Sequence, residues 1–301
     1  MARAMTMMLL AMVILPGMDA VAKWLSGTVS SGQVSAARFI FQTLFLLPFI
    51  FLARGKWLTP NVLLHVARGV LIASATVLFF SGLAYLPIAD SLALFFIEPM
   101  LVTLLSVALL RESVGWRRFT AILIGFLGAM IVIRPSFVSV GWAVLYPITA
   151  ALCFSFYILL TRMLAVKDDP IRMQFFAGVF GGLAISLALV IGTQNDIAIF
   201  TASWPTVHEF LLLGLLGLVG TVGHLLVVLA FQRAPISVLA PFQYVEIISG
   251  TVLGLWLFGD FPEPLTWLGI ALIVATGIYI FHRESMQGQS IRSGSAHIID
   301  K

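Results

Sequence analysis

The sequence predicts an all-α membrane protein with ten transmembrane helices in two inverted-topology repeats of five helices each. Composition is the first reason: 60% of the 301 residues are hydrophobic and only 10% are charged, against about 25% charged in a soluble domain. The second is a series of apolar runs that reach the roughly 20 residues needed to cross a bilayer. The third is an internal match between the two halves of the chain. Together these observations exclude a water-soluble fold.

The apolar runs define ten expected spans along the chain. Alternating segments of about 10 residues, which are typical of membrane barrels, do not occur. The first span is too long for a cleaved signal peptide and carries charged residues near its end. The polar tail 283–301 has no apolar period and is expected to be disordered. The expected spans are approximately 4–25, 33–53, 62–84, 88–110, 117–133, 141–161, 171–193, 208–230, 235–258 and 265–282.

The basic residues set the orientation. All seventeen Lys and Arg except Lys23, Arg38 and Arg134 lie at the termini or in connections on one side of the ten-span topology. Because cytoplasmic loops carry the excess of Lys and Arg, both termini are expected to be cytoplasmic in a bacterial inner membrane. The same loops account for the net charge of +4, so topology explains it better than nucleic-acid binding does.

The internal repeat appears when the chain is shifted by 148 residues. Spans four and five then superpose on spans nine and ten without a gap, and the only two mid-span glutamates become a pair. Each expected repeat, 1–134 and 135–282, has an odd number of helices, so the second must be inverted relative to the first. Inverted repeats are typical of secondary transporters, with the substrate site at the repeat interface. The matched pairs are Pro87 with Pro235, Ile88 with Ile236, Glu98 with Glu246, Thr103 with Thr251 and Glu112 with Asp260.

Glu98 and Glu246 are expected near the middle of the membrane. Each lies ten or eleven residues into its span, or about 15 Å at about 1.5 Å per residue. A charge at that depth is costly, so each carboxyl should face a cavity or a partner, or be protonated. Pro99 removes a backbone donor beside Glu98 and loosens the helix. Two interpretations stay open: a proton-coupling carboxyl in a functional cavity, or a neutral side chain beside a kink that shapes packing.

A stretch of the first half carries a family resemblance. LFFSGLAYLPIADSLALFFIEPMLVTLLSVALLRESVGWRRFTAILIGFLGAMIVIRP, residues 78–135, resembles the signature of the drug/metabolite transporter superfamily, EamA branch. The second half resembles it more loosely, because Asp260 stands where the family usually has glutamate. The resemblance implies a ten-helix carrier similar to bacterial exporters of amino acids and other metabolites, within a superfamily that also moves nucleotide-like compounds, vitamins and drugs. The residues that match in order are Pro87, Pro99, Glu112, Gly125, Gly128, Arg134 and Pro135.

Other polar residues inside the spans are candidates for substrate binding. Asp19, Lys23 and Arg38 are expected at similar depth and either neutralise one another or grip the ammonium and carboxylate of a zwitterion. Gln42 lies one turn deeper on the face of Arg38. By contrast, Arg68 lies near the inner end of its span, where a long side chain can reach water, and a topological role is favoured. His65 shares that position.

Aromatic, histidine and small residues complete the candidates. Tyr146, Tyr157, Gln243 and Tyr244 are candidates for lining an amphipathic pocket, although most aromatic residues in such a chain simply pack. His224 is a third candidate for proton coupling beside Glu98 and Glu246, although a lone histidine is more often a packing residue. Small residues allow helix backbones to approach closely in membranes. The candidate hinge and packing residues are Pro16, Pro99, Gly220, Gly250 and Gly254.

These observations favour a secondary transporter over a membrane enzyme or a channel. The sequence has no HExxH, no Walker motif and no filter-like loop. The single Cys153 excludes an intrachain disulfide and a cysteine metal cluster. We expect export of small zwitterions such as amino acids by alternating access, with import or exchange of a larger nucleotide-like, vitamin or drug compound as the alternative. No cofactor, metal or nucleic acid is expected, and the chain is expected to work as a monomer.

Overall fold

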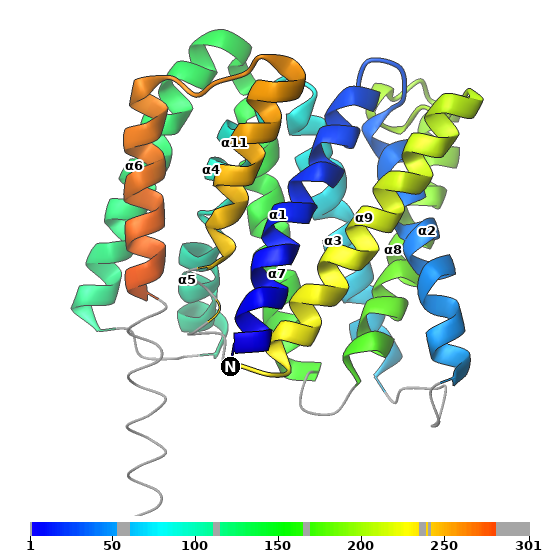
Figure 1. Cartoon of the computed structure of the whole chain (residues 1–301), viewed down its shortest axis with the longest axis horizontal. Coiled ribbons are helices and arrows are strands. Elements are labelled where there is room, and N and C mark those ends of the chain that lie inside the picture. The colour runs from blue at the N-terminus through cyan, green and yellow to red at the C-terminus, as the bar shows by residue number, and fades with distance from the viewer. Residues whose placement is uncertain are drawn as a thin grey trace, which may run out of the picture.

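The computed structural model describes residues 2–52, 61–110, 115–164, 169–234, 239 and 242–280, and all regular structure among them is helical. Figure 1 shows long helices standing side by side in one bundle. The long helices are α1 Ala2–Leu25, α2 Ser31–Leu52, α3 Val62–Leu83, α6 Trp116–Val140, α7 Leu145–Leu164, α8 Pro170–Gln194 and α9 Val207–Phe231. The shorter ones are α4 Ile88–Phe95, α5 Glu98–Leu110, α11 Val245–Phe258 and a helix at Pro264–Ile280, with 3-10 turns η1 Gly141–Val144 and η2 Ala198–Phe200.

The described helices suit a membrane. Seven stretches are long and apolar enough to span one, and the helix Pro264–Ile280 is among the shorter apolar helices. Large apolar side chains lie on the outside of the bundle, for example Met130 and Val252, where lipid rather than water would surround them. The count of ten spans stays a prediction. The expected tail 283–301 and the matched residues Glu112, Pro235 and Ile236 lie outside the described residues.

Capping residues explain where two helices begin. Asp169 precedes α8, and its carboxylate accepts hydrogen bonds from the backbone N–H groups of Ile171 and Arg172. Thr206 and Glu209 form a capping box at the start of α9. Both arrangements satisfy N–H groups that have no partner within the helix. The polar ends of these apolar helices are therefore defined locally by sequence.

Helices from the two ends of the sequence pack together. In the bundle α1 packs against α9 and α11, α2 against α8 and α9, and α3 against α7 and α8. Glycine makes one of these contacts possible, because a Cβ added to Gly69 of α3 would lie 2.6 Å from the Cβ of Phe180 and 2.9 Å from the backbone N of Gly181 in α8. Any larger residue at position 69 would push these helices apart.

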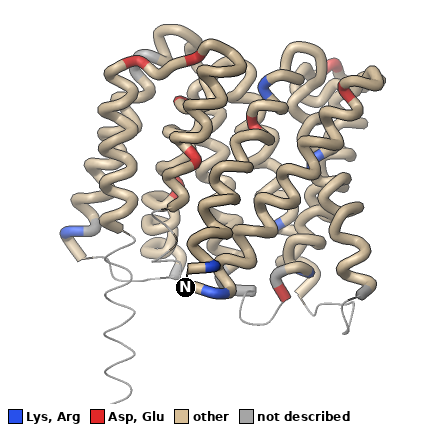
Figure 2. The backbone as a smooth tube through the Cα atoms, viewed as in Figure 1, with Lys and Arg blue, Asp and Glu red and all other residues tan. Residues whose placement is uncertain are grey.

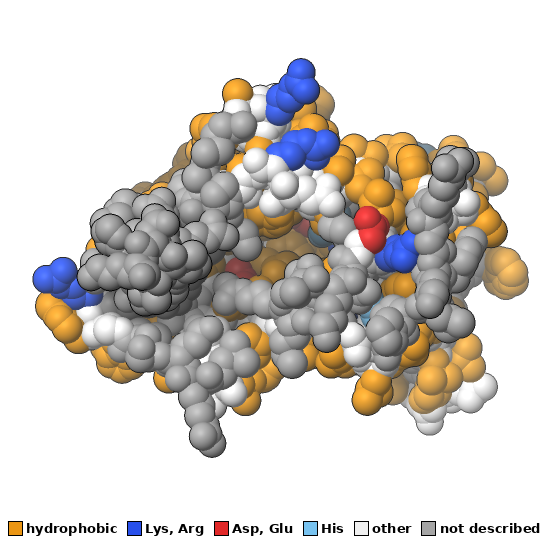
Figure 3. Space-filling model, turned by 90° about the horizontal axis from the view of Figure 1, so that it is seen from below, with side chains coloured by type: hydrophobic (Ala, Val, Ile, Leu, Met, Phe, Trp, Pro, Cys, Tyr) orange, Lys and Arg blue, Asp and Glu red, His pale blue; other side chains and the backbone are white. Residues whose placement is uncertain are grey.

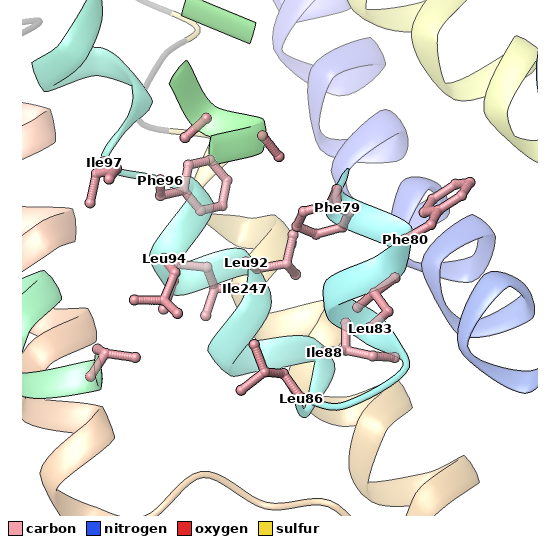
Figure 4. Close-up of a cluster of buried hydrophobic side chains, with 14 of the residues drawn as sticks. Phe79, Phe80, Leu83, Leu86, Ile88, Leu92, Leu94, Phe96, Ile97 and Ile247 are labelled. Atoms are coloured by element: carbon pink, nitrogen blue, oxygen red, sulfur yellow. The ribbon is translucent and has the colours of Figure 1, made fainter. Parts of the chain in front are cut away.

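The helix expected at 88–110 is broken. α4 ends at Phe95 and α5 begins at Glu98, so Phe96 and Ile97 form the link between them. Figure 4 shows Phe96 and Ile97 at the end of α4, within a cluster of apolar side chains that includes Leu92 and Ile247. A second break precedes α11, where Tyr244 separates the helical residues 242–243 from Val245. The loosening expected at Glu98-Pro99 is thus a full interruption of the helix.

Candidate functional site

The two helix breaks meet in the centre of the bundle. The rings of Phe96 and Tyr244 lie in contact, with centroids 5.2 Å apart, and these two positions differ by the repeat shift of 148. Glu98 and Glu246 follow two residues later, in the first turns of α5 and α11. Both carboxyl side chains are partly exposed. Glu98 and Glu246 therefore belong to helix starts that lie close to one another, whereas their expected depth in the membrane stays a prediction.

The residues at the break between α4 and α5 are partly exposed although the helices around them are closely packed. α4 is packed among α3, α6, α7 and α11, and its residues Ile88–Leu94 are buried, yet Phe95 at its end is partly exposed. Figure 3 shows the face that carries the N-terminus hollowed near its middle, with hydrophobic side chains and an acidic side chain at depth. Phe95 and Glu98 are thus partly exposed on either side of a buried link, and the expectation that Glu98 faces a cavity stays a prediction.

Tyr244 carries a buried hydroxyl group at the second break. Its side chain is 6% exposed, and its hydroxyl has no hydrogen-bond partner among the described residues. A Cβ added to Gly277 would collide with this hydroxyl, so glycine at position 277 makes the room for it. A buried polar group without a partner costs free energy unless water or a ligand satisfies it.

Arg38 of α2 lies inside the bundle, and its hydrogen-bond partners among the described residues are neutral groups. Its side chain is 3% exposed, with Nη1 donating to Thr76 Oγ1 at 2.5 Å and Nη2 lying 3.2 Å from His224 Nε2. Since a guanidinium can only donate, His224 Nε2 must accept and its Nδ1 must carry the hydrogen. That Nδ1 donates to the backbone oxygen of Gly220 at 2.8 Å. His224 is therefore neutral here and orients Arg38.

Asp19 of α1 lies between charges of both signs. Its side chain is 3% exposed; it is attracted by Arg38 and repelled by Glu246. Among the described residues, no oxygen of Asp19 comes within 4.0 Å of a cationic nitrogen. Arg38 Nε also has no hydrogen-bond partner there. The interior thus holds a buried acid and a buried base that do not form an ion pair.

Lys23 does not join Asp19 and Arg38, and the expected trio is wrong on this point. Its Nζ donates to Asp260 Oδ2 at 2.8 Å and to the backbone oxygen of Leu86 at 2.7 Å. It also lies 5.3 Å from the ring centroid of Phe258. Lys23 therefore links the end of α1 to the residues after α11 and to the connection between α3 and α4. Equal depth along neighbouring helices did not place these side chains on one face.

Arg68 of α3 is buried. The topological interpretation assumed that its side chain reaches water, and this assumption is wrong. The side chain is 1% exposed. Its Nε donates to Thr161 Oγ1 at 2.9 Å, and its Nη2 donates to the Tyr157 hydroxyl at 3.3 Å. His65 is equally buried and packs on Phe176. The sequence analysis did not predict that Arg68 is buried. The signal that could have shown it was the adjacent Gly69, which allows α8 to pack closely against α3.

The remaining candidates are spread over the bundle. Gln42 donates to the backbone oxygen of Gln174 at 2.9 Å and so links α2 to α8, rather than lining the cavity. Tyr146 stacks on the exposed Tyr85 near the start of α7. Gln243 lies directly before the second break and is partly exposed. Charged residues occur in the middle of the helices as well as at the ends of the bundle (Figure 2).

The expected small residues do bring helices together. A Cβ on Gly220 of α9 would lie 2.8 Å from the sulfur of Met18 in α1, and one on Gly250 of α11 would lie 2.6 Å from Leu92 Cδ1 in α4. Gly254 has more room, with its nearest neighbour at 3.6 Å. Close packing at the first two positions holds α1 and α4 against the second half of the chain.

Comparison with known proteins identifies the family. A model of the EamA-like transporter family matches residues 2–134 and 141–281. This chain belongs to the EamA-like transporter family. The resemblance found in the sequence is thereby confirmed, and the protein is a multi-pass membrane transporter.

Relatives of this EamA-like transporter bear more specific names. It is 27% identical to an S-adenosylmethionine uptake transporter of Rickettsia bellii (strain RML369-C), over 92% of each chain. It is 30% identical to a riboflavin transporter of Rhizobium johnstonii (strain DSM 114642 / LMG 32736 / 3841), over 92% of this chain and 90% of the other. One solved crystal structure superposes with a TM-score of 0.62 over 93% of this chain and 97% of that chain. At 18% identity, that likeness shows the fold alone.

Proposed function

We propose that this protein is a secondary transporter that takes up a nucleoside-like metabolite across the bacterial inner membrane by alternating access. The names of its relatives, S-adenosylmethionine uptake transporter and riboflavin transporter, support this class. Both compounds join a planar nitrogen heterocycle to a polar chain. Amino-acid export, which the sequence favoured, has no support from these relatives, so the alternative of an importer for a larger metabolite becomes the proposal. The relatives are named as transporters, which also speaks against an enzyme.

The observation that carries the proposal is the meeting of the two helix breaks at Phe96 and Tyr244. The contact is between positions related by the 148-residue shift, as expected where the axis of an inverted repeat passes through the bundle. Separate family matches to 2–134 and 141–281 support the division into two repeats of five helices, with ten spans in all. In such carriers, discontinuous helices direct the positive ends of their dipoles at the substrate.

The central side chains supply the binding groups of this proposal. Asp19, Glu98 and Glu246 offer negative charge from α1, α5 and α11, whereas Arg38 offers positive charge from α2. Phe95 is partly exposed beside the break and offers flat apolar surface, and the buried Tyr244 hydroxyl has no hydrogen-bond partner among the described residues. Glu98 and Glu246 are the candidates for proton coupling. His224 instead holds Arg38 in place.

Orientation follows from the basic residues. With the N-terminal face in the cytoplasm, the hollow in Figure 3 opens inwards. At the opposite end, Lys23 joins α1 to Asp260 and to Leu86, which closes the outside. We therefore interpret the structure as an inward-open state of the transport cycle, with both termini cytoplasmic.

Flux measurements test the proposal directly. The purified protein is reconstituted in liposomes, and entry of labelled S-adenosylmethionine, riboflavin and a mixture of amino acids is measured with and without a pH gradient. We expect entry of at least one of the first two compounds and no competition from free amino acids. Transport of amino acids with neither of the first two compounds moving would overturn the proposal.

A further inference from the structure

The charges inside the bundle fall into two groups on different helices. Acidic side chains come from α1, α5 and α11: Asp19, Glu98 and Glu246. Buried basic side chains come from α2 and α3: Arg38 and Arg68. An interior with separate negative and positive groups suits a substrate that itself carries both charges.

Neither buried arginine forms an ion pair with a carboxylate within 4.0 Å in the described part of the chain. Arg38 contacts Thr76 and the neutral His224. Arg68 contacts the hydroxyls of Thr161 and Tyr157 and, at 3.5 Å, a backbone oxygen. Burying a guanidinium costs much of its hydration free energy, and a neutral acceptor restores less of it than a carboxylate does. An anionic group of a substrate would supply a direct partner of opposite charge, and Arg38 Nε, which has no hydrogen-bond partner among the described residues, could donate to it.

Tyr157 connects the two arginines. Its hydroxyl accepts a hydrogen bond from Arg68 Nη2 at 3.3 Å, and its ring lies 5.0 Å below the guanidinium carbon of Arg68. Tyr157 also packs against the apolar cluster that contains Phe39, and the guanidinium carbon of Arg38 lies 4.6 Å from the centroid of the Phe39 ring. Arg68 therefore fixes the position of a hydroxyl group beside the apolar cluster that Arg38 also contacts. Arg68 is a positioning residue, since it is 1% exposed and acts through Tyr157.

A row of aromatic rings leads from this positive group to the glutamates. Each ring contacts the next, with centroid separations of 5.2 to 6.4 Å. The rings of Phe95, Phe154 and Tyr157 are partly exposed and offer stacking surface to a planar heterocycle. The row runs through Tyr157, Phe154, Phe95, Phe96 and Tyr244.

We propose that the transporter selects a zwitterionic substrate, whose carboxylate binds Arg38 and the Tyr157 hydroxyl positioned by Arg68, and whose cationic group faces Asp19, Glu98 and Glu246. The planar ring of the substrate lies along the aromatic row. This inference rests on the proposed function and narrows it. A compound such as S-adenosylmethionine carries carboxylate, ammonium and sulfonium groups that can pair with the charged side chains of the interior. Riboflavin is uncharged and would leave those side chains unpaired.

Substrate analogues test the charge requirement one group at a time. In proteoliposomes, entry of S-adenosylmethionine is compared with entry of its decarboxylated analogue and of the uncharged-sulfur thioether analogue. We expect the wild-type protein to prefer the intact compound to the decarboxylated one by about tenfold, the effect of one charge-assisted hydrogen bond. Arg38→Gln should lose this preference. Tyr157→Phe, which keeps the ring, should weaken it through a raised KM with kcat little changed.

A matched control separates charge selectivity from loss of structure. Arg117 is exposed at the start of α6, and Arg117→Gln should keep the full preference. If Arg38→Gln does not reach the membrane, the comparison rests on Tyr157→Phe and on the wild-type protein. Equal entry of the intact and decarboxylated compounds into wild-type liposomes, or entry of riboflavin alone, would overturn the inference and leave the proposed function standing. Failure of every adenosyl and flavin compound to enter would instead overturn the proposed function.

Discussion

Lys23 and Arg38 are cationic residues from the first two helices, and their side chains have different interaction partners. Lys23 has a carboxylate at 2.8 Å and a backbone oxygen at 2.7 Å, and it remains 16% exposed. Arg38 is 3% exposed, has neutral hydrogen-bond partners and keeps its Nε without a hydrogen-bond partner among the described residues. The charge of Lys23 is therefore paired with a carboxylate of the protein, whereas the charge of Arg38 has no such ion pair among the described residues.

This difference separates a structural charge from a binding charge. An ion pair that retains some water contributes modestly and can break and re-form during a transport cycle. A buried guanidinium without an acid is costly in the empty protein, and the cost is recovered when an anionic group binds. We therefore assign Lys23 to closing the outer end and Arg38 to holding substrate. Substitutions of Arg38 and Lys23 test this assignment directly, and those of Glu98 and Gly69 test the groups around it.

The largest effect is expected from Arg38→Ala. Removal of this buried cation, whose Nε has no partner among the described residues, should lower uptake at least tenfold, since a hydrogen bond between charged groups is worth about 1.5–3 kcal/mol. Lys23→Ala should lower it far less. Uptake is measured in membrane vesicles and normalised to the amount of each variant in the membrane. Equal losses in the two variants would remove the distinction between them.

Glu98→Gln should separate coupling from transport. A carboxyl near the middle of the membrane can take up and release a proton as the cavity opens to each side, and the amide resembles its neutral form. We expect substrate exchange to survive while accumulation driven by a pH gradient disappears. The measurement compares exchange and accumulation in the same proteoliposomes, with Glu246→Gln in parallel. Full pH-driven accumulation by the Glu98→Gln protein would exclude Glu98 as the coupling group.

Lys23→Gln should shift the protein towards an outward-open state rather than abolish transport. Leu86 is 1% exposed and lies beside Lys23, so a cysteine at position 86 reports on opening at this end. Cys153 is the only native cysteine and is replaced by serine first. Labelling by a membrane-impermeant maleimide should be several-fold faster when Lys23→Gln is added.

The charge swap provides the control for this experiment. The double variant Lys23→Asp with Asp260→Lys should label slowly again, because the ion pair is re-formed with reversed polarity. Fast labelling of the cysteine at position 86 with Lys23 intact would mean that the pair does not close this end.

The sequence predicted the local features of this molecule well. Apolar runs located the long helices, and Glu98-Pro99 marked the break between α4 and α5, because both signals depend on residues that are neighbours in the chain. The family pattern around Pro87 and Pro99 was also local, and the family match confirmed it.

The long-range contacts were not predictable in the same way. The partner of Lys23 is 237 residues away, and depth in the membrane does not tell which helix lies opposite. Arg68 was assigned to the surface by counting residues from a loop, yet α7 and α8 cover it. Only the packing of α3, set by glycines, reveals that burial.

The smallest effect is expected from Gly69→Ala, which changes the surroundings of a buried arginine without altering any charge. The added methyl group would lie 2.6 Å from the Cβ of Phe180 and 2.9 Å from the backbone of Gly181, so α8 must move away from α3. Overpacking of this kind costs about 1–3 kcal/mol, and the shift should also loosen the contact of Arg68 with Tyr157. We expect a melting temperature lowered by several degrees and a KM raised a few-fold, with kcat almost unchanged. Gly27→Ala is the matched control, because a Cβ at position 27 meets nothing within 4 Å. A Gly69→Ala protein with the stability and KM of the Gly27→Ala protein would show that close packing of α3 on α8 does not set the position of Arg68.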